Sequence, residues 1–317
     1  MLEQRVAPPA SEKYERLIER ARVLQPIPTV VVYPCDETSL RGPLEAAEAG
    51  IIEPTLVGPA ATIRRIGGEL GLELGAYKIV DVAGSVESAE RGVALIRDGT
   101  GEVLMKGSLH TDELMHAVMK TATGLRTARR ISHVFVMAVP SYPETLFVTD
   151  AAINIAPDLD AKRDIVQNAI DLHLAGIGTP RVAILSAVET VTTKIPSTID
   201  AAALCKMAER GQITGGIVDG PLAFDNAIDP EAARIKGITS PVAGRAQILV
   251  VPDLEAGNML AKNLTFMLKA DAAGIVLGAR VPIVLTSRAD SVRVRMASCA
   301  VAQLYAHARR ASPVPAA

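Results

Sequence analysis

The chain of 317 residues has no tryptophan, and aromatic residues make up only 3% of it. Surfaces that bind bases or sugars by aromatic stacking are therefore not expected. No run of about 18 uncharged apolar residues occurs, which argues against a membrane-spanning helix. An excess of one charge is also lacking, since 33 Lys and Arg residues stand against 35 Asp and Glu residues. We therefore expect small-molecule substrates as partners, with no nucleic acid and no membrane.

Cysteine is scarce as well. Cys35, Cys205 and Cys299 are far apart in the sequence and odd in number, so they indicate neither a disulfide framework nor a CxxC site. The N-terminal stretch 1–25 mixes acidic and basic residues and lacks the apolar core of a secretory signal. These features predict a cytoplasmic protein whose three thiols are buried as small hydrophobic groups.

Several motifs of metal, nucleotide and hydrolase chemistry are absent from the sequence. There is no GxxxxGK[ST] phosphate loop, no HExxH or paired Cys/His spacing, and no GxSxG turn. The GIGT sequence at 176–179 resembles part of a dinucleotide loop, but it precedes a predicted strand instead of following one. We interpret it as a connection from a helix to a strand, and we predict no metal site.

The chain does have a regular alternation of branched apolar runs and helical segments, which is typical of a parallel sheet. Two apolar runs, 131–139 and 145–148, are separated by Pro140, Ser141, Tyr142 and Pro143 and predict a hairpin. The length allows two domains. We predict an α/β fold made of two α/β domains with a cleft between them. The other predicted strands are 29–33, 54–57, 78–82, 103–105, 182–185 and 247–251, and predicted helices include 40–49, 161–175, 200–209 and 258–270.

The segment from Ile283 to Ser291, IVLTSRADS, is the most informative one. Its branched apolar start predicts a buried strand, and its polar end, which contains Ser287, Arg288 and Asp290, precedes a helical pattern. Ligands of open α/β sheets bind outside the carboxyl ends of strands, and Arg matches the geometry of phosphate oxygens. The segment therefore predicts an anion site. The alternatives are that Ser287 caps a helix and that Arg288 forms a structural ion pair.

Four further segments combine glycine with polar groups at the ends of predicted elements. Gly–Gly and Asp–Gly–Pro sequences allow the backbone to approach a ligand closely, although the same sequences also form tight turns in compact proteins. The segments are MKGSLHT at 105–111, GLRTARR at 124–130, ITGGIVDGPLAFDNA at 213–227 and SPVAGRAQILVVPDLEAGN at 240–258.

Together with IVLTSRADS, these segments closely resemble the phosphate acetyl- and butyryltransferase family. The resemblance covers about residues 29–305. It implies two domains in the fold shared with isocitrate and isopropylmalate dehydrogenases, with the active site between them. It also implies a last segment that returns to the first domain, giving domain I at 1–138 plus 273–317 and domain II at 139–272. A homodimer is expected on the same ground.

The family reaction converts an acyl-CoA and inorganic phosphate into an acyl phosphate and free CoA, without a metal or a permanently bound cofactor. The resemblance implies that Ser287 contacts the thioester or the leaving sulfur and that Arg288 contacts phosphate or the oxyanion. Arg126 matches a second anion-binding arginine of the family.

Four further residues are candidates for substrate binding. Asp225 and Asn226 lie in the DGPLAFDNA segment, and Asn258 ends the PDLEAGN segment. Asn258 could equally cap a following helix. Lys106 is a candidate for attracting phosphate, and a surface lysine is the alternative.

The sequence departs from the acetyltransferase pattern at one position. An aspartate proposed in that branch as the base acting on CoA follows the serine by seven residues, and Val294 stands there in this chain. Asp290 is a candidate substitute. The valine favours the butyryltransferase branch or a mixed acyl preference. Two other functions remain open: a non-catalytic relative that binds CoA or acyl phosphate, and a metal- and NAD-dependent dehydrogenase of the related fold.

Overall fold

The computed structural model describes residues 10–285 and 290–311. The chain divides into two compact units: unit 1 comprises Met1–Lys13 and Arg130–Ala272, and unit 2 comprises Tyr14–Arg129 and Ala273–Ala317. Each unit is built on an open sheet with helices, so the α/β fold class is confirmed. The domain limits at 138/139 and 272/273 stay a prediction.

The sheet of unit 2 has the strand order β3-β2-β1-β4-β11-β10. All of these strands are parallel except β10, which is antiparallel to β11. β1 illustrates why such segments form strands, since IPTVVV is rich in β-branched residues and almost all of it is buried. The strands are β1 (Ile27–Val32), β2 (Ile52–Gly58), β3 (Lys78–Asp81), β4 (Val103–Lys106), β10 (Asp271–Leu277) and β11 (Ile283–Val284).

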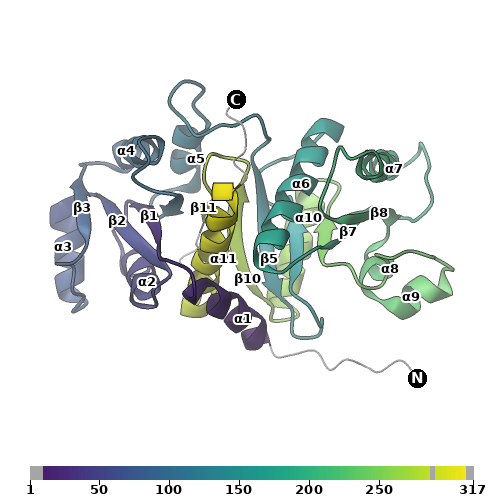
Figure 1. Ribbon diagram of the computed structural model, residues 1–317, viewed down its shortest axis with the longest axis horizontal. Coiled ribbons are helices and arrows are strands. Elements are labelled where there is room, and N and C mark those ends of the chain that lie inside the picture. Colours follow the sequence, from purple (N-terminus) through teal and green to yellow (C-terminus); the bar gives the residue numbers. More distant parts are fainter. Residues whose placement is uncertain (1–9, 286–289, 312–317) are drawn as a thin grey trace. The chain divides into compact units, whose positions relative to one another are not determined.

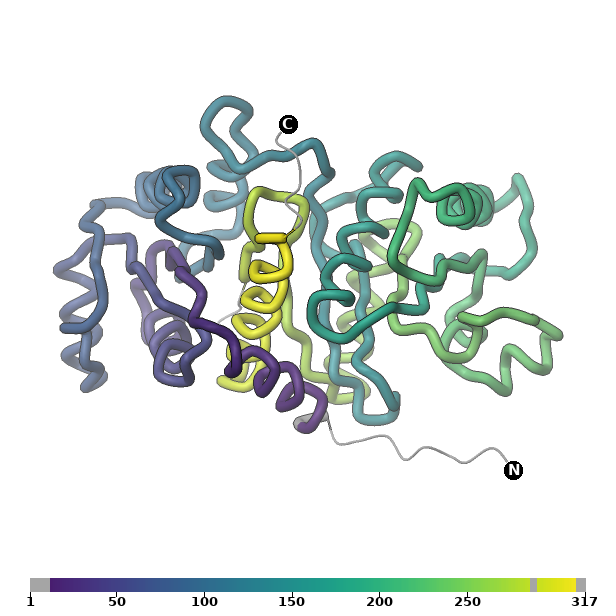
Figure 2. The backbone as a smooth tube through the Cα atoms, viewed as in Figure 1, coloured from purple at the N-terminus to yellow at the C-terminus, as the bar shows by residue number. Residues whose placement is uncertain are grey.

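Helices from both ends of the chain belong to unit 2. The last helix packs against β11 and against the second helix, so the yellow end of the chain lies beside its purple start (Figures 1 and 2). Asp36 caps the second helix by accepting a hydrogen bond from the Ser39 backbone N–H at 2.8 Å. The helices are α1 (Ala10–Arg22), which begins in unit 1, α2 (Glu37–Glu48), α3 (Ala60–Glu69), α4 (Ser85–Arg97), α5 (Thr111–Met119) and α11 (Val292–Ala311).

The sheet of unit 1 has the strand order β5-β6-β9-β7-β8. β5 and β6 form the predicted antiparallel hairpin, and the other pairs are parallel. The strands are β5 (Ser132–Ala138), β6 (Leu146–Thr149), β7 (Arg181–Leu185), β8 (Ile217–Leu222) and β9 (Ile248–Val250). The helices are α6 (Leu159–Gly176), α7 (Pro196–Glu209), α8 (Phe224–Ile228), α9 (Pro230–Ile235) and α10 (Leu254–Phe266).

The structure corrects the sequence prediction in three places. IVDGPL, taken as a ligand loop, is strand β8. The helix predicted at 258–270 is α10 at Leu254–Phe266, and Met267 and Leu268, which lie within the predicted range, follow the observed helix and are 76% and 48% exposed. The residues after it form strand β10, for which no strand was predicted from the sequence, and Gly274 lies within that strand. The predicted apolar spacing therefore began one turn too late along the chain.

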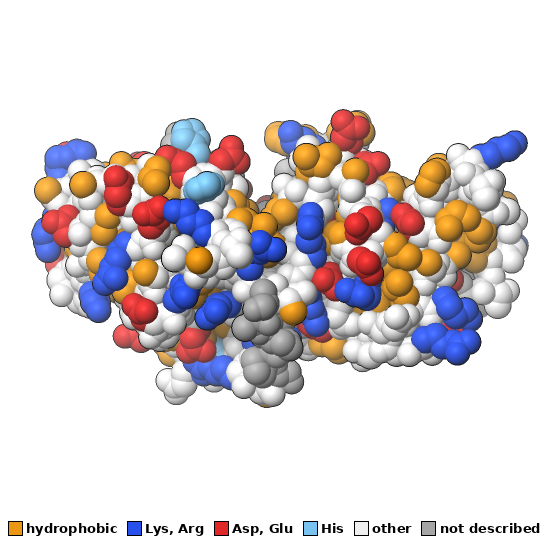
Figure 3. Space-filling model, turned by 90° about the horizontal axis from the view of Figure 1, so that it is seen from above, with side chains coloured by type: hydrophobic (Ala, Val, Ile, Leu, Met, Phe, Trp, Pro, Cys, Tyr) orange, Lys and Arg blue, Asp and Glu red, His pale blue; other side chains and the backbone are white. Residues whose placement is uncertain are grey.

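No helix among the described residues is long and apolar enough to cross a membrane. Basic and acidic side chains are mixed over the face drawn in Figure 3. That face therefore has no broad area of a single charge.

Candidate functional site

In unit 2, the carboxyl ends of β1, β4 and β11 lie next to one another. The register pairs Val32 of β1 with Lys106 of β4, and Val284 of β11 with Met105 of β4. The residues that follow these strands therefore leave the same edge of the sheet, which is where open α/β sheets bind ligands. Lys106 lies at this edge, and Leu285, the last described residue before the gap at 286–289, follows β11 there.

Gly107 explains how β1 and β4 approach so closely at this edge. Its backbone N–H donates to the Val32 carbonyl at 2.8 Å, and a Cβ atom at this position would lie 2.4 Å from the Tyr33 carbonyl oxygen. Any larger residue would push the two strand ends apart. Ser108 adds a side-chain link, because its hydroxyl donates to the Tyr33 carbonyl at 2.9 Å and accepts from the Cys35 N–H at 3.2 Å.

Lys106 is half-buried at the end of β4, and its ammonium donates to the Gly107 carbonyl at 3.1 Å. The side chain is therefore held at the strand ends and does not extend freely into solvent. Its predicted role in attracting phosphate stays a prediction.

The two residues expected to carry the chemistry, Ser287 and Arg288, lie outside the described residues. The chain is described again from Asp290, which is half-buried, and α11 begins at Val292. The Ser291 hydroxyl accepts a hydrogen bond from the Val294 N–H at 3.3 Å. Ser291 therefore caps this helix, whereas the capping alternative for Ser287 falls on a residue outside the described ones.

A buried arginine holds the start of α11. Arg295 is 7% exposed, its Nη1 donates to the Asp290 carbonyl at 2.5 Å, and its Nη2 lies 3.9 Å from a Glu45 carboxylate oxygen on α2. Gly42 on α2 makes room for this guanidinium, since a Cβ there would be 2.9 Å from Cδ and Nε of Arg295. Arg295 was not predicted from the sequence. The signal available in the sequence was its position on the first helical turn after the polar end of IVLTSRADS.

Val294, at the position of the missing aspartate, is 5% exposed and packs in the core of unit 2. A buried valine has no group that can accept a proton, so this position supplies no base.

Arg126 lies at a different edge of unit 2. Its backbone forms an antiparallel bridge with Ala279, and the neighbouring Leu125 carbonyl accepts from the Arg280 N–H at 2.9 Å. The turn between β10 and β11 lies at the amino end of β11, so the length of the strands separates Arg126 from Lys106. The Arg126 side chain is exposed, with Nη1 3.5 Å from the Thr121 hydroxyl. The structure does not bring these two predicted anion-binding residues together.

In unit 1, the carboxyl ends of β6 and β9 lie next to each other, and α10 starts after β9. Asn258 lies in the second turn of α10, and its Nδ2 donates to the Ala151 carbonyl at 3.3 Å. The helix is capped by Asp253, whose carboxylate accepts from the Ala256 N–H at 2.9 Å. The alternative that Asn258 caps a helix is therefore wrong.

Asp225 and Asn226 follow β8 in the short helix α8, and they differ in exposure. Asp225 is exposed, whereas Asn226 is fully buried and its Nδ2 lies 3.4 Å from the Glu189 carboxylate. The Asn226 carbonyl also accepts from the Gly244 N–H at 2.7 Å. Asn226 thus links α8 to the loop before β9, and Asp225 is the more accessible of the two.

The glycines near these segments pack against the protein itself. A Cβ at Gly220 would lie 2.7 Å from the Ile184 carbonyl oxygen, and one at Gly216 would lie 3.0 Å from Ile170. These contacts explain the glycines of ITGGIVDGPL by the close approach of β8 to β7 and α6.

Asp150, which was not predicted from the sequence, follows β6 directly and is 3% exposed. Its carboxylate accepts from the backbone N–H groups of Ala152, Ile153 and Asn154 at 3.0, 3.1 and 3.1 Å. The Asn154 amide donates to it at 2.6 Å. A carboxylate directly after a strand was a signal that the sequence contained.

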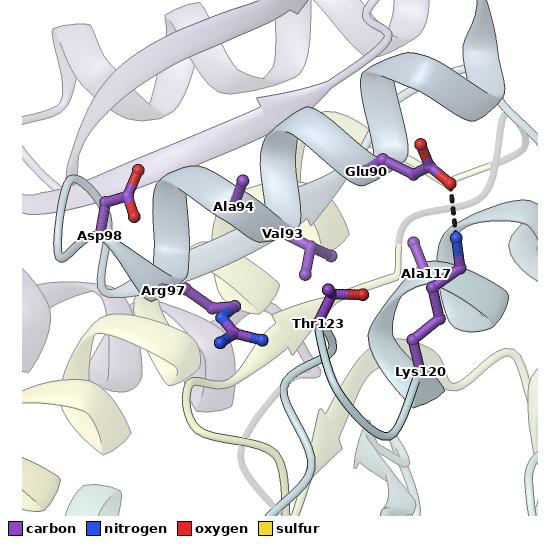
Figure 4. A pocket seen from close by; sticks show the side chains of 8 residues that line it. All are labelled: Glu90, Val93, Ala94, Arg97, Asp98, Ala117, Lys120 and Thr123. Atoms are coloured by element: carbon purple, nitrogen blue, oxygen red, sulfur yellow. Dashed lines mark hydrogen bonds and ion pairs between the residues drawn. The ribbon is translucent and has the colours of Figure 1, made fainter.

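Two pockets involve other residues. One of about 460 Å³ in unit 1 is lined mainly by apolar side chains, including Tyr142, Phe224 and Leu264. The other, about 420 Å³ in unit 2, lies between α4 and the end of α5, where Lys120 and Glu90 form an ion pair at 2.5 Å (Figure 4). None of the predicted site residues that the structure describes lines either pocket. Among the described residues no cluster of His, Cys, Asp or Glu is suited to hold a metal.

Open sheets whose parallel strands end among polar loops define this protein as an α/β protein of the kind that binds small ligands at strand ends. The profile of a family described as "Phosphate acetyl/butaryl transferase" matches residues 85–303. A phosphate acetyltransferase of Rhizobium meliloti is 73% identical over 310 residues, covering 98% of each chain. The chain belongs to this family of acyltransferases.

Other relatives and structures agree with this assignment. A phosphate butyryltransferase of Clostridium beijerinckii is 39% identical, covering 93% of this chain and 98% of its own. A branched-chain phosphotransacylase from Enterococcus faecalis superposes with a TM-score of 0.75 at 29% identity, covering 88% and 99%. A 4-hydroxythreonine-4-phosphate dehydrogenase from Burkholderia phymatum shares the fold alone, with a TM-score of 0.53 at 15% identity and coverage of 90% and 97%.

Proposed function

We propose that the protein is a phosphate acyltransferase that moves a short acyl group reversibly between CoA and inorganic phosphate. The observation that carries the proposal is the 73% identity, over nearly the whole chain, to a protein named phosphate acetyltransferase. The dehydrogenase alternative has no comparable support, because the dehydrogenase likeness extends only to the fold. CoA and phosphate are substrates in this proposal, and no cofactor or metal is bound permanently.

The reaction proceeds by direct attack in a ternary complex. A phosphate oxygen bonds to the thioester carbonyl carbon, and the carbon–sulfur bond then breaks. The leaving CoA thiolate takes up a proton. Such a reaction gains mainly from holding both substrates in line and from donors aimed at the developing oxyanion.

In this proposal Ser287 contacts the thioester or its sulfur, and Arg288 contacts phosphate or the oxyanion. Lys106 supports phosphate binding from the end of β4, since β4 is the neighbour of the strand that leads into Ser287 and Arg288. Asp290 is the acid nearest to that pair in the sequence. In this proposal it takes the place of the aspartate that the acetyltransferase branch has at the position of Val294.

Asn258 and Asp225 bind substrate from unit 1. The hydrogen bonds of Asn226 hold α8, the short helix that also contains Asp225. Arg126 has the weakest support among the predicted binding residues, because it lies at the opposite end of the strands from Lys106.

The acyl group is proposed to be acetyl in preference to butyryl. Val294 favoured the butyryltransferase branch. The higher identity to proteins named phosphate acetyltransferase, at 73% and 55%, against 39% and 41% for those named phosphate butyryltransferase, favours acetyl. One methylene changes the preference by only about 1 to 3 kcal/mol, so both substrates should react. A cytoplasmic location and a homodimer belong to the same proposal.

The test is phosphate-dependent release of free CoA thiol from acetyl-, propionyl- and butyryl-CoA, with arsenate as a parallel acceptor. Turnover that needs phosphate or arsenate supports the proposal, and the ranking of the acyl groups gives the preference. If CoA is bound but no thiol is released from any of the three, the protein is a CoA-binding relative, a second candidate that the buried Val294 favours.

Replacement of Arg288 by alanine is expected to lower kcat by about 100-fold or more, because a donor to an oxyanion is worth about 3 to 4 kcal/mol. Thermal unfolding should change little. The matched control is Arg64→Ala, which removes an exposed arginine from α3. Turnover of the Arg288 variant close to that of the control would contradict the assigned role.

A further inference from the structure

Two loops of unit 1 lie side by side at the carboxyl ends of β6 and β9. The first loop, 149–155, begins at the last residue of β6. The second loop, 251–253, connects β9 to α10. The Val251 N–H donates to the Thr149 carbonyl at 2.9 Å, and the Leu254 N–H donates to the Ile155 carbonyl at 3.0 Å. The second loop and the start of α10 are therefore supported by the backbone of the first loop.

The closest contact between them involves Gly257 of α10. A Cβ at this position would lie 3.0 Å from Cβ of Ala151 and 2.7 Å from a Val251 methyl carbon. The glycine thus allows α10 to approach Ala151. The next residue, Asn258, donates to the Ala151 carbonyl. The position of Asn258 consequently depends on where Ala151 is held.

Asp150 determines the shape of the first loop. Its carboxylate is buried and accepts hydrogen bonds from three successive backbone N–H groups and from the Asn154 side chain. Asn154 has its remaining groups satisfied, because its amide also donates to the Ile131 carbonyl at 2.9 Å and its oxygen accepts from Arg130 Nε at 2.8 Å. Hydrogen bonds to a charged acceptor are about twice as strong as neutral ones, and no water competes for a buried carboxylate.

Among residues 10–285 and 290–311, Asp150 has no cationic partner of its own. The nearby His133 is 3% exposed, and burial lowers the pKa of its imidazole to about 4, so the ring is neutral at pH 7. The Arg130 guanidinium donates to the Asn154 side chain, which in turn donates to the Asp150 carboxylate. The negative charge is therefore balanced mainly by N–H dipoles of the loop, which ties the conformation of the loop directly to that charge.

We infer that Asp150 is a positioning residue: it holds the 149–155 loop so that Ala151 fixes Asn258 for binding of the acyl-CoA substrate. This inference rests on the proposed function, and in particular on the substrate-binding role of Asn258. Asp150 does not touch the substrate and acts through the Ala151 carbonyl. Its replacement should therefore affect substrate binding only while Asn258 is present.

The experiment is a double-mutant cycle on the full chain, with Asp150→Asn, Asn258→Ala and the pair, measuring kcat and KM for acetyl-CoA. Each single change should raise KM by about tenfold with little change in kcat, and the pair should match Asn258→Ala alone, since coupled neighbours are not additive. The matched control is Asp158→Asn, which removes another backbone-capping carboxylate, bonded to the Ala161 N–H at 2.9 Å, from the same unit. It should lower the melting temperature and leave KM unchanged.

Effects on KM that multiply, or an Asp150 variant that changes only stability as Asp158→Asn does, would overturn the inference. An unchanged KM in Asn258→Ala would also overturn it. If Asp150→Asn does not fold, Gly257→Ala serves instead: it leaves Asp150 intact, pushes α10 away from Ala151 and should raise KM, and an unchanged KM would refute the inference. A wild-type protein that releases no CoA would refute the proposed function itself, which is a distinct result.

Discussion

Arg295 is an unusual residue for the first turn of a helix, because an arginine is rarely buried so completely. Its guanidinium has no room to move, since Gly42 lies against Cδ and Nε and Asp290 accepts from Nη1. A buried charge with only a distant carboxylate is costly to keep. This cost is consistent with a role in holding Asp290, which lies two residues after Arg288.

Gly42→Ala tests this role without removing the arginine. A helix-interior Gly-to-Ala change by itself stabilises by about 1 kcal/mol. The added Cβ should displace the guanidinium from the Asp290 carbonyl, so we expect lower kcat with a melting temperature near that of the wild type. The control is Gly68→Ala on α3, where a Cβ would meet nothing within 4 Å. Equal turnover in both variants would show that the position of Arg295 does not matter.

At the scale of elements, the apolar patterns predicted most strands and helices. The βα alternation from β1 to β4 and the β5–β6 hairpin were found where the sequence placed them, because branched apolar runs have few other ways to be buried. β8 was missed because Asp219, Gly220 and Pro221 are typical of turns. Its neighbour β7 and helix α7 cover it and override that local preference.

The candidate site was predictable only in part, for a related reason. Strand ends are visible in the sequence, so Lys106 was placed correctly at the end of β4. Which strand ends share an edge is decided by pairing between distant segments, and this pairing separates Arg126 from Lys106. Asp150 and Arg295 carry no recognisable motif, and their places after a strand and after the polar segment become informative only with the buried hydrogen bonds that they form.

The junction of β1 and β4 gives a prediction about these two strands. Gly107→Ala would place a Cβ 2.4 Å from two backbone carbonyl oxygens, which no side-chain rotation can relieve. We expect the free energy of unfolding to fall by about 1 to 3 kcal/mol, as for overpacked cores, with a loss of phosphate affinity as Lys106 moves. Urea unfolding measures the first effect and KM for phosphate the second. Gly75→Ala, where a Cβ would have open space, should show neither.

At the scale of the whole molecule, both strongly perturbed histidines belong to unit 1. Burial lowers the pKa of His133 and of His173 to about 4, from an ordinary value of 6.5. Below pH 6.5 the unfolded chain takes up protons that these folded imidazoles do not. Stability should therefore fall as the pH is lowered from 6.5 to about 4, by up to about 3 kcal/mol for each histidine.

The measurement is the free energy of unfolding from pH 7 to pH 4 by urea titration. His173→Gln, which cannot become charged, should reduce the loss. His307→Gln, a change at a histidine that is not buried, is the control and should leave the loss as it is in the wild type. A flat profile in the wild type across this range would contradict the assignment of neutral buried histidines.

The chain order of unit 2 has a consequence for synthesis on the ribosome. Unit 1 draws most of its residues from one continuous stretch, Arg130–Ala272, whereas unit 2 needs residues from both ends of the chain. β11 lies between β4 and β10, and α11 packs on β11 only after the last residues emerge. During translation the edge of β4 that later pairs with β11 therefore stays unpaired while the stretch 130–272 of unit 1 is synthesised. This nascent edge is the point at which a stalled or truncated chain is most exposed to pairing with other chains or to capture by a chaperone.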